Sequence, residues 1–489
     1  MNKSLHQLFI AAITLFAILI ASTTWWSIVQ ADSLNNDPRN TRALYHELSM
    51  PRGQILAADG TILAQSEKSS DTFKYQRSYA DGSLYAPVTG FFSVTTRADR
   101  GLEAAENQLL TGDSSSQWFS RLQALFTGQE NSGATIETSI EPKLQRLAGQ
   151  LLTGQTGAIV ALEPTTGRIL ALVESPSYDP NLLATHNTTA SKAEYQKLLA
   201  ENPSPLDGIA TKQTFEPGAV FDIITAAAAL GSGKYTASSS ISAPNVYIAP
   251  GTSTTVTNGV YWDGYSATSS MSLADAFAYS SNTAFASLGN ALGYQALADE
   301  AAQFGFGSTI TIDGNHDTGI PMTAVASSFA TMQEAGGAAL GAIGRGGTRA
   351  TPLQVAMMVS AVADHGTIMK PTLVDSVRSA DLSLISQTTP TVFSKPMNAS
   401  AAASLTAMME SLVSTQDAGL ELSSGAKVAA VVGSSVNTSD SQTNTDWSAG
   451  FAPASNPSIV VCAFVENAHG APASVTSPMM EQLMEEDLK

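Results

Sequence analysis

The chain has 489 residues, of which 43% are hydrophobic and 13% charged, and its 24 Lys and Arg against 42 Asp and Glu give a formal net charge of −18. The apolar fraction excludes a disordered chain, and the acidic balance excludes nucleic acid as an expected partner, because phosphate recognition needs clustered cations. With a single cysteine, Cys462, and six scattered histidines, the sequence offers no internal disulfide, no paired metal ligands and no cofactor motif.

The first thirty residues predict a membrane anchor. Residues 8–29 are strongly apolar and would span about 33 Å as a helix, which matches a hydrocarbon core. Lys3 precedes this stretch and favours a cytoplasmic N-terminus, while Trp25 and Trp26 fall where an aromatic belt would meet the outer headgroups. A cleaved signal peptide is the alternative, but residues 29–31 form a mediocre cleavage site. We expect one uncleaved anchor, with the rest of the chain outside the membrane.

The next hundred residues indicate short strands followed by helices. Residues 52–57 and 59–64 read as two strands across an Asp-Gly turn. Residues 97–125 show a helical, amphipathic pattern that is interrupted by a loop at residues 111–116. Residues 127–133 form a Gly- and Asn-containing linker that we interpret as a hinge. A helix with proline in its first turn is expected over residues 142–152.

The remaining chain predicts a sheet covered by helices. Its first elements are an apolar hairpin, residues 157–162 and 168–173. A nearly unbroken apolar helix at 219–230 is expected to lie in the core, where Cys462 is also expected as a small buried residue. Further helices are predicted at 271–288 and 352–365, and strands at 428–432 and 459–465. Hairpin, helices and strands in this order indicate an α/β (α+β) fold.

Several long segments resemble the class B penicillin-binding proteins, the membrane-anchored D,D-transpeptidases of bacterial cell-wall synthesis, and in particular their actinobacterial PbpA-like branch. They include RGQILAADGTILAQ, GAIVALEPTTGRILALVESPSYDPN and much of the C-terminal half. The resemblance implies a transpeptidase domain like that of penicillin-binding proteins and serine β-lactamases, above a mostly β pedestal domain. It divides the chain into a cytoplasmic tip and transmembrane anchor (1–30), a pedestal or dimerisation-like domain (31–152) and a transpeptidase-like domain (153–489).

The family's first active-site motif, S-x-x-K, is lost in this sequence. Its usual context survives as EPGAVFD, in which Ala219 occupies the position of the nucleophilic serine and Asp222 that of the lysine. Residues three apart share a helix face, so the family's serine and lysine would lie together there. An alanine supplies no nucleophile, and losing the nucleophile of a covalent mechanism costs many orders of magnitude in rate.

The second motif, S-x-N, is retained as Ser280-Ser281-Asn282, whereas the third is not. The family's K-T-G or K-S-G falls at Val431-Val432-Gly433, followed by Ser434, and the later segment WSAGFAP supports this register. In the family the third motif holds the substrate's terminal carboxylate. Together the changes shift the pocket formally by about three charge units toward negative, which would repel a carboxylate.

Alternatives remain open at several of these positions. Backbone N–H groups at Ala219 and Ser434 could still form an oxyanion hole, and Ser280, Asn282 and Ser434 are candidate binding residues. Ser280 and Asn282 could equally cap or bridge helices. Asp222 could be buried and neutral, paired with Asn282 or Ser280, or be an exposed acid in the first helical turn.

The sequence gives little support for a catalytic serine–lysine pair at another position in the chain. Ser424 and Lys427 are the one serine–lysine pair with the required spacing, but they lie in a Ser/Gly loop rather than at the start of a buried helix. Because a motif counts only in its structural context, we interpret this match as chance.

The leading hypothesis is therefore a membrane-anchored, catalytically inactive relative of these transpeptidases, a scaffold or regulator on the outer side of the bacterial membrane. The resemblance implies peptidoglycan or its precursors, and a SEDS-type glycan polymerase, as partners. The alternatives are an active D,D-transpeptidase that cross-links stem peptides, and a non-covalent sensor of peptidoglycan or β-lactams.

Overall fold

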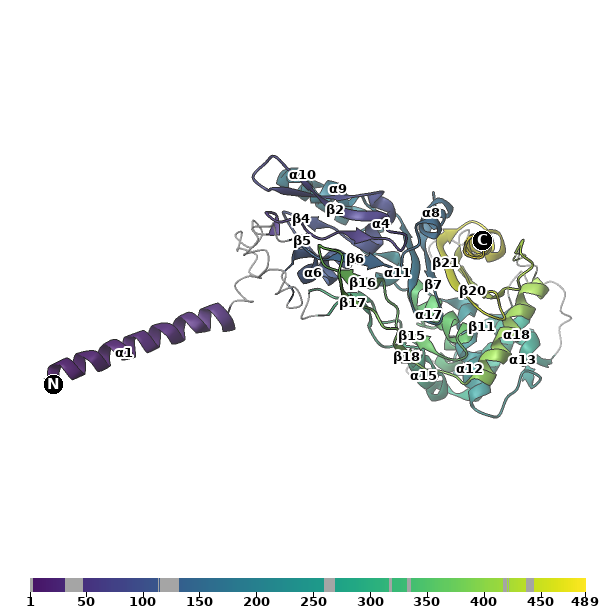
Figure 1. Ribbon diagram of the computed structural model, residues 1–489. Helices are drawn as coiled ribbons and strands as arrows, with labels where there is room; N and C mark the ends of the chain where they lie inside the picture. Colours follow the sequence, from purple (N-terminus) through teal and green to yellow (C-terminus); the bar gives the residue numbers. More distant parts are fainter. Residues whose placement is uncertain are drawn as a thin grey trace.

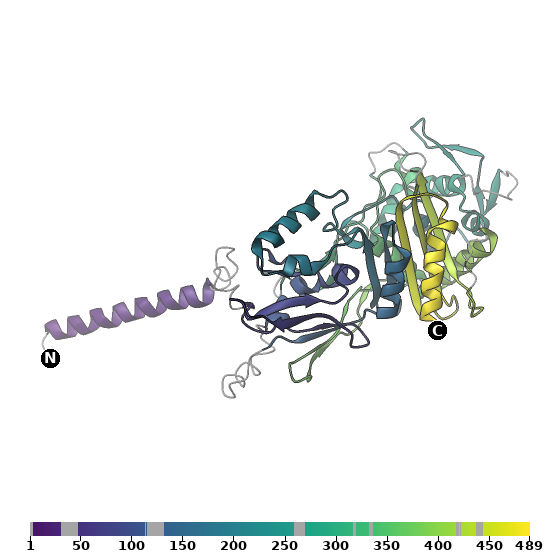
Figure 2. The same cartoon turned by 90° about the horizontal axis from the view of Figure 1, so that it is seen from above.

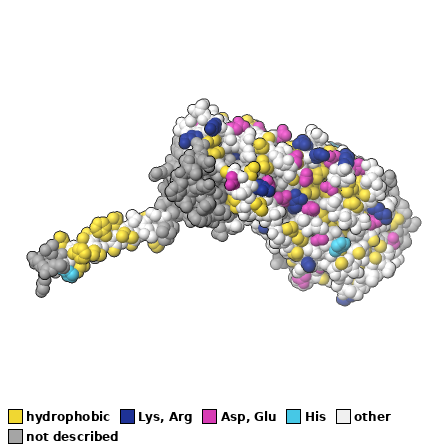
Figure 3. Space-filling view, viewed as in Figure 1, with side chains coloured by type: hydrophobic (Ala, Val, Ile, Leu, Met, Phe, Trp, Pro, Cys, Tyr) yellow, Lys and Arg dark blue, Asp and Glu magenta, His cyan; other side chains and the backbone are white. Residues whose placement is uncertain are grey.

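One long N-terminal helix projects from the body of the protein (Figure 1). The computed structural model describes residues 3–30, 47–112, 114, 132–258, 269–315, 319–331, 336–416, 420, 422–436 and 444–489. Helix α1 (Lys3–Thr24) continues into a π-helical turn, η1 (Trp25–Val29). Its apolar side chains lie on the surface (Figure 3), and residues 6–27 are long and apolar enough to cross a membrane.

The first sheet combines strands from distant parts of the chain. Its six strands run in the order β17-β16-β6-β1-β2-β3. The bounds are Ile55–Leu56 (β1), Ile62–Lys68 (β2), Tyr75–Tyr79 (β3), Thr135–Thr138 (β6), Val374–Arg378 (β16) and Leu384–Gln387 (β17). The pair β1–β6 is parallel and the other pairs are antiparallel. The two strands predicted within residues 52–64 are confirmed, whereas β16 and β17 were not predicted.

Short helices accompany this sheet. They are α4 (Gly82–Thr89), α5 (Gly101–Ala105) and α6 (Asn107–Thr111). The prediction of a helix beginning at residue 97 is wrong, because residues 97–98 form strand β5 (Arg97–Ala98) with β4 (Phe92–Ser93). Gly112, in the left-handed conformation, ends α6. The later part of that predicted helix and residues 127–131 of the predicted hinge lie outside the described residues.

A buried ion triad stabilises the core beside this sheet. Glu103 is 0% exposed and accepts hydrogen bonds from Arg52 Nε at 2.5 Å, Arg77 Nε at 2.6 Å and the Tyr79 hydroxyl at 3.1 Å. Burial alone would raise the pKa of Glu103, but the charges of Arg77 and Arg52 overcome this and lower it. The carboxylate is therefore ionised and doubly paired.

The second sheet has five antiparallel strands in the order β19-β20-β21-β7-β8. They span Ala429–Val436 (β19), Asn444–Ala452 (β20), Ile459–Ala468 (β21), Thr156–Leu162 (β7) and Ile169–Ser175 (β8). The predicted hairpin and both predicted C-terminal strands are thus confirmed. Alternate residues of β21 enter two different clusters of the core, because successive side chains of a strand point to opposite faces.

The predicted covering of the sheet by helices is confirmed, and helices lie on both of its faces. Helices α8 (Pro142–Leu151) and α19 (Thr476–Asp487) lie together over one face (Figure 2). The other face packs against α17 (Pro352–Ala363), all twelve residues of which are buried, and against α11 (Ile209–Lys212). Cys462 is 0% exposed on that face, and burial raises the pKa of its thiol, so its predicted place in the core is confirmed.

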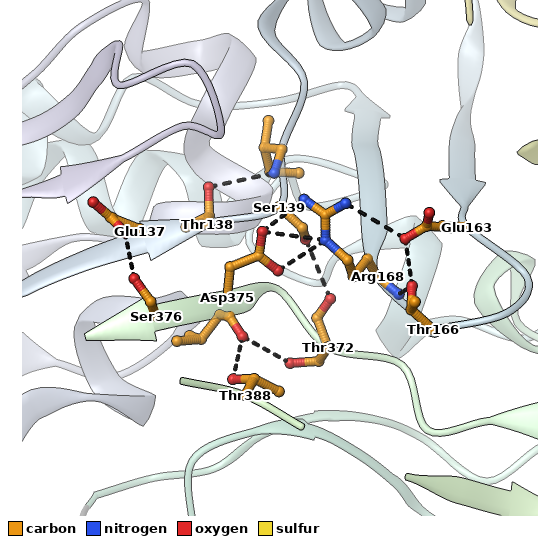
Figure 4. A network of polar contacts seen from close by, with 12 residues as sticks. Glu137, Thr138, Ser139, Glu163, Thr166, Arg168, Thr372, Asp375, Ser376 and Thr388 are labelled. Carbon is orange, nitrogen blue, oxygen red and sulfur yellow. Dashed lines mark hydrogen bonds and ion pairs between the residues drawn. The ribbon is translucent and has the colours of Figure 1, made fainter. Parts of the chain in front are cut away.

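Polar contacts join the two sheets (Figure 4). Arg168, just before β8, pairs with Asp375 on β16 at 2.6 Å and with Glu163 at 3.4 Å. The hydroxyl of Ser139, just after β6, donates to the carbonyl of Ile169 at 2.7 Å. Strands of the first sheet are therefore bonded directly to the hairpin of the second.

Candidate functional site

The predicted first motif lies at a tight junction between a helix start and the edge strand β19. Residues Gly218–Phe221 form a 3-10 turn, η3, which leads into α12 (Asp222–Gly231). A Cβ atom at Gly433 would lie 2.6 Å from the carbonyl oxygen of Pro217, so only glycine allows this approach. The sequence prediction of a buried helix is confirmed, with its first turn tightened to 3-10 geometry.

Ala219 is partly buried within η3 and presents a methyl group where the resemblance places the serine. The turn is held against neighbouring segments, because Gly218 N donates to the carbonyl of Gly344 at 3.3 Å and Trp447 Nε1 donates to that of Glu216 at 2.9 Å. The hydrogen bonds that hold this turn in place are thus formed, although Ala219 provides no nucleophilic side chain.

Asp222 is a buried carboxyl group. It is 2% exposed, and its Oδ1 has no hydrogen-bond partner among the described residues. Burial raises the pKa of Asp222 well above its usual range, which favours the neutral acid. The exposed alternative is therefore wrong. The predicted charge shift is also too large, since a neutral Asp222 reduces it from about three units to about two.

The predicted pairing of Asp222 with the second motif is not formed, because both candidate partners bond elsewhere. Ser280 Oγ accepts from Gln416 Nε2 at 3.1 Å, which ties it to α18 (Ala399–Gln416). Asn282 Nδ2 donates to the carbonyl of Thr257 at 3.2 Å. The prediction that these residues bridge helices is confirmed for Ser280, whereas Asn282 bonds to strand β11 (Thr255–Thr257).

The second motif interrupts the helix predicted at 271–288. The structure has β12 (Ser270–Ser272), α13 (Leu273–Ala278) and α14 (Asn282–Leu292) instead. Ser280 adopts a left-handed φ of 47°, which ends the first helix. Ser281 then caps α14 by accepting from Ala284 N at 3.3 Å. The break places Ser280 and Asn282 on either side of this cap.

The third-motif positions are largely packed into the fold. Val431 is 1% exposed in the core, and Val432 is half-buried. Ser434 donates to Asp446 Oδ1 on β20 at 2.7 Å. Burial raises the pKa of Asp446 to about 6, and its Oδ2 has no partner among the described residues. The hydroxyl proposed for ligand binding is thus already engaged.

The contacts of Gln416 and Asp446 were not predicted from the sequence. Asp446 faces Ser434 in the β19–β20 register, and a hairpin prediction joining residues 428–432 to the segment around Trp447 would have paired them. Gln416 reaches Ser280 from the last turn of a helix far along the chain, and no local pattern signals that contact. Of the serine–lysine pair with the required spacing, Lys427 is exposed and forms an ion pair with Glu410 at 3.0 Å.

Two family models match most of the chain. Residues 157–485 match the penicillin binding protein transpeptidase domain, and residues 52–136 match the penicillin binding protein A dimerisation domain. The chain belongs to the penicillin-binding protein family. This membership confirms the resemblance inferred from the segments and motifs of the sequence.

Two actinobacterial relatives are similar to this chain over nearly the whole length of both proteins. The peptidoglycan D,D-transpeptidase PbpA of Mycolicibacterium smegmatis is 36% identical over 475 residues, which is 96% of this chain and 94% of that protein. The protein of the same name from Mycobacterium tuberculosis is 35% identical over 478 residues. Solved structures of penicillin-binding protein A from M. tuberculosis have a similar fold. The imipenem acyl-enzyme complex of that protein matches with a TM-score of 0.82 at 32% sequence identity. The match covers 91% of this chain and 99% of the M. tuberculosis chain.

Proposed function

We propose that this chain is a membrane-anchored, catalytically inactive penicillin-binding protein that serves peptidoglycan synthesis as a scaffold or regulator. The observation that carries the proposal is the methyl group of Ala219 at the position of the nucleophile. Covalent acyl transfer begins with attack by a hydroxyl oxygen, and alanine has none. Removing such a nucleophile lowers the turnover rate by about a million-fold in serine hydrolases.

The surroundings of Ala219 support the same conclusion. A neutral acid, Asp222, stands where the family places a lysine, so no lysine amine is available there to accept a proton from a nucleophile. Val431 fills the other lysine position with a buried apolar side chain. These substitutions remove both the base and the cation that would attract a substrate carboxylate.

The preserved architecture supports a non-catalytic role. We propose an anchor at residues 1–30, a pedestal or dimerisation-like domain at 31–152 and a transpeptidase-like domain at 153–489, with the bulk of the chain outside the bacterial membrane. Helix α1 has the length and apolarity for the anchor. By family analogy the partners would be peptidoglycan precursors and a SEDS-type glycan polymerase, with a role in cell shape or cell division.

Labelling with a fluorescent penicillin tests the loss of catalysis. Penicillin-binding protein A of M. tuberculosis, which forms a penicillin G acyl-enzyme complex, is the positive control. The full chain, purified in detergent, should show no covalent band under conditions that label the control. A band that unlabelled penicillin G competes away would overturn the proposal.

The variant Ser424→Ala distinguishes the two ways in which such a band could arise. If Ser424→Ala abolished the band, the nucleophile would have been relocated to the loop before β19. If Ser424→Ala left it unchanged, another nucleophile would carry the reaction. Either result would replace the scaffold proposal with an active transpeptidase.

A further inference from the structure

Helix α5 packs against a hairpin of two short strands, β13 (Ile310–Asp313) and β14 (Met322–Ala324). Gly314 directly follows β13 and has a left-handed φ of 73°. A Cβ atom at Gly314 would lie 2.6 Å from the carbonyl oxygen of Ala105, at the end of α5. The backbones of the helix and the hairpin therefore touch with no side chain between them, and this contact has little room to rearrange.

Each side of this contact carries one buried carboxyl group. Glu106, between α5 and α6, is 8% exposed, and its carboxylate accepts a hydrogen bond from the Gly314 N–H. Asp313, the last residue of β13, is also 8% exposed. Its carboxylate accepts from the Thr372 hydroxyl at 2.8 Å and from the Leu373 N–H at 2.6 Å. Figure 4 shows Thr372 just before strand β16, so both acids lie where α5, β13 and the start of β16 meet.

The two carboxyl groups titrate near neutral pH, and ionisation of one opposes ionisation of the other. Burial raises the pKa of Glu106 to about 7, with a further contribution from the charge of Asp313. Burial likewise raises the pKa of Asp313 to about 7, although its hydrogen bonds and the more weakly acting charge of Lys370 oppose this rise. Because little water screens two buried charges, the contact is most favourable while the acids are protonated.

The other charged groups on the packed elements pair elsewhere and do not neutralise the two acids. Lys212 reaches β14, but its Nζ donates to the Thr323 hydroxyl at 2.8 Å. Of the described cations, Lys370 acts on Asp313, and burial outweighs its effect. The remaining ion pairs are Glu103 with Arg52 and Arg77, Arg100 with Asp99, and Asp375 with Arg168.

We propose that Glu106 and Asp313 form a pH-sensitive latch, which holds α5 and α6 against the β13–β14 hairpin when the carboxyl groups are protonated and loosens this contact when both are ionised. In the proposed division of the chain, α5 and α6 belong to the pedestal domain and the hairpin to the transpeptidase-like domain. The pH outside the membrane therefore sets how firmly these two domains are held together. The latch uses none of the motif positions, so its test is independent of the penicillin-labelling result.

Hydrogen–deuterium exchange of the full chain in detergent, followed by mass spectrometry from about pH 5 to about pH 8, tests the latch. Opening the contact returns the carboxyl groups to water, where their pKa values are 4.5 for Glu106 and 3.8 for Asp313. The closed state binds more protons than the open state, so opening becomes more favourable as pH rises from about 4 to about 7. After correction for intrinsic exchange rates, opening of α5, α6 and β14 should rise by up to about tenfold per pH unit for each acid and should level off above pH 7. Helix α17, which is wholly buried, is the internal reference and should show a much smaller rise.

A charge-neutral variant assigns the pH dependence to this pair of acids. Glu106→Gln keeps an acceptor for the Gly314 N–H, so it should fold normally and show only the rise that belongs to Asp313, about tenfold per pH unit at most. Glu300→Gln on α15 (Tyr294–Gln303) is the matched control, because burial also raises the pKa of Glu300 to about 7; it should leave the exchange of α5 and α6 unaltered. Three results would overturn the proposal: no rise of exchange with pH in α5, α6 and β14, a rise of the same size in α17, or the same pH dependence in Glu106→Gln as in the wild type.

Discussion

Two buried carboxyl groups, one beside the first sheet and one at the start of α12, are stabilised in opposite ways. Beside the first sheet, Glu103 is ionised and held by Arg52 and Arg77. At the start of α12, the Oδ1 of Asp222 has no partner among the described residues, and burial raises the pKa of Asp222. A buried charge is tolerated only when it is paired, and otherwise the group becomes neutral. The region around Glu103 therefore contains a complete ion network. The region around Asp222 buries an acid that has no cation or hydrogen-bond donor at its Oδ1 among the described residues.

Breaking the ion network should have the largest effect on stability. Glu103→Gln removes the charge shared by two buried guanidinium groups, so the free energy of unfolding should fall by about 3–5 kcal/mol. Chemical denaturation of the full chain in detergent measures this change. Glu194→Gln is the matched control, because Glu194 pairs with an exposed lysine, and its effect should stay within about 0.5 kcal/mol. Similar effects of the two changes would contradict the comparison.

Replacing Asp222 should change how stability depends on pH. The pKa of this acid is raised by folding, so the folded state binds more protons and stability falls as pH rises above the unfolded value near 3.8. Asp222→Asn stays neutral and should gain on the wild type by up to about 1.4 kcal/mol per pH unit in that window. Denaturation midpoints measured from pH 4 upward test this. If stability depended on pH in the same way in both proteins, the carboxyl group of Asp222 would have a stabilising partner in the folded state.

Glu103 should show the opposite sign. Its pKa is lowered in the folded state, so its contribution is present above the unfolded value near 4.5 and is lost as pH falls. At neutral pH the wild type should therefore be more stable than Glu103→Gln, and this advantage should shrink as the pH falls. The gain of Asp222→Asn over the wild type should also shrink as the pH falls, because Asp222 is then protonated in both the folded and the unfolded state. At neutral pH the first substitution destabilises the protein and the second does not.

The smallest effect is expected at the edge strand. Ser434→Ala removes the hydrogen bond to Asp446 and should cost about 1 kcal/mol. Because Ser434 lowers the pKa of Asp446, the substitution should also raise that pKa above about 6. Denaturation and carboxyl titration by NMR measure the two changes. Ser435→Ala, one position along β19, is the control and should leave the pKa of Asp446 unaltered.

Sequence patterns predicted the second sheet well, because its strands and helices carry strong apolar periodicity. The hairpin β7–β8 and helix α17 are nearly continuous apolar runs, and both were found with boundaries close to those observed. Strands β16 and β17 were missed, since short polar segments such as VDSVR and LISQ show no clear alternation. The pairing of β16 with β6 is a long-range contact that local propensity does not encode, and β17 joins the sheet only through β16.

The candidate site was predictable in position but not in detail. Flanking segments such as EPGAVFD and the serines at 280 and 281 located the elements that carry it. The sequence left open whether Asp222 is exposed, because an acid in a first helical turn suits either environment. Only the packing around α12 decides this. The break at Ser280 was also missed, since a left-handed serine inside an apolar stretch is stabilised by contacts such as that with Gln416.

The interleaved first sheet has a consequence for the order in which the protein can be completed during synthesis. Strands β1 to β3 leave the ribosome early, but their sheet is finished only when β16 and β17 follow about 300 residues later. At bacterial-scale elongation rates this delay is roughly 15–60 s. During that interval the exposed edge of β6 has no neighbour on one side and needs protection from pairing with other chains. The edge of β6 is therefore covered only after the C-terminal half of the chain, which contains β16, has been translated.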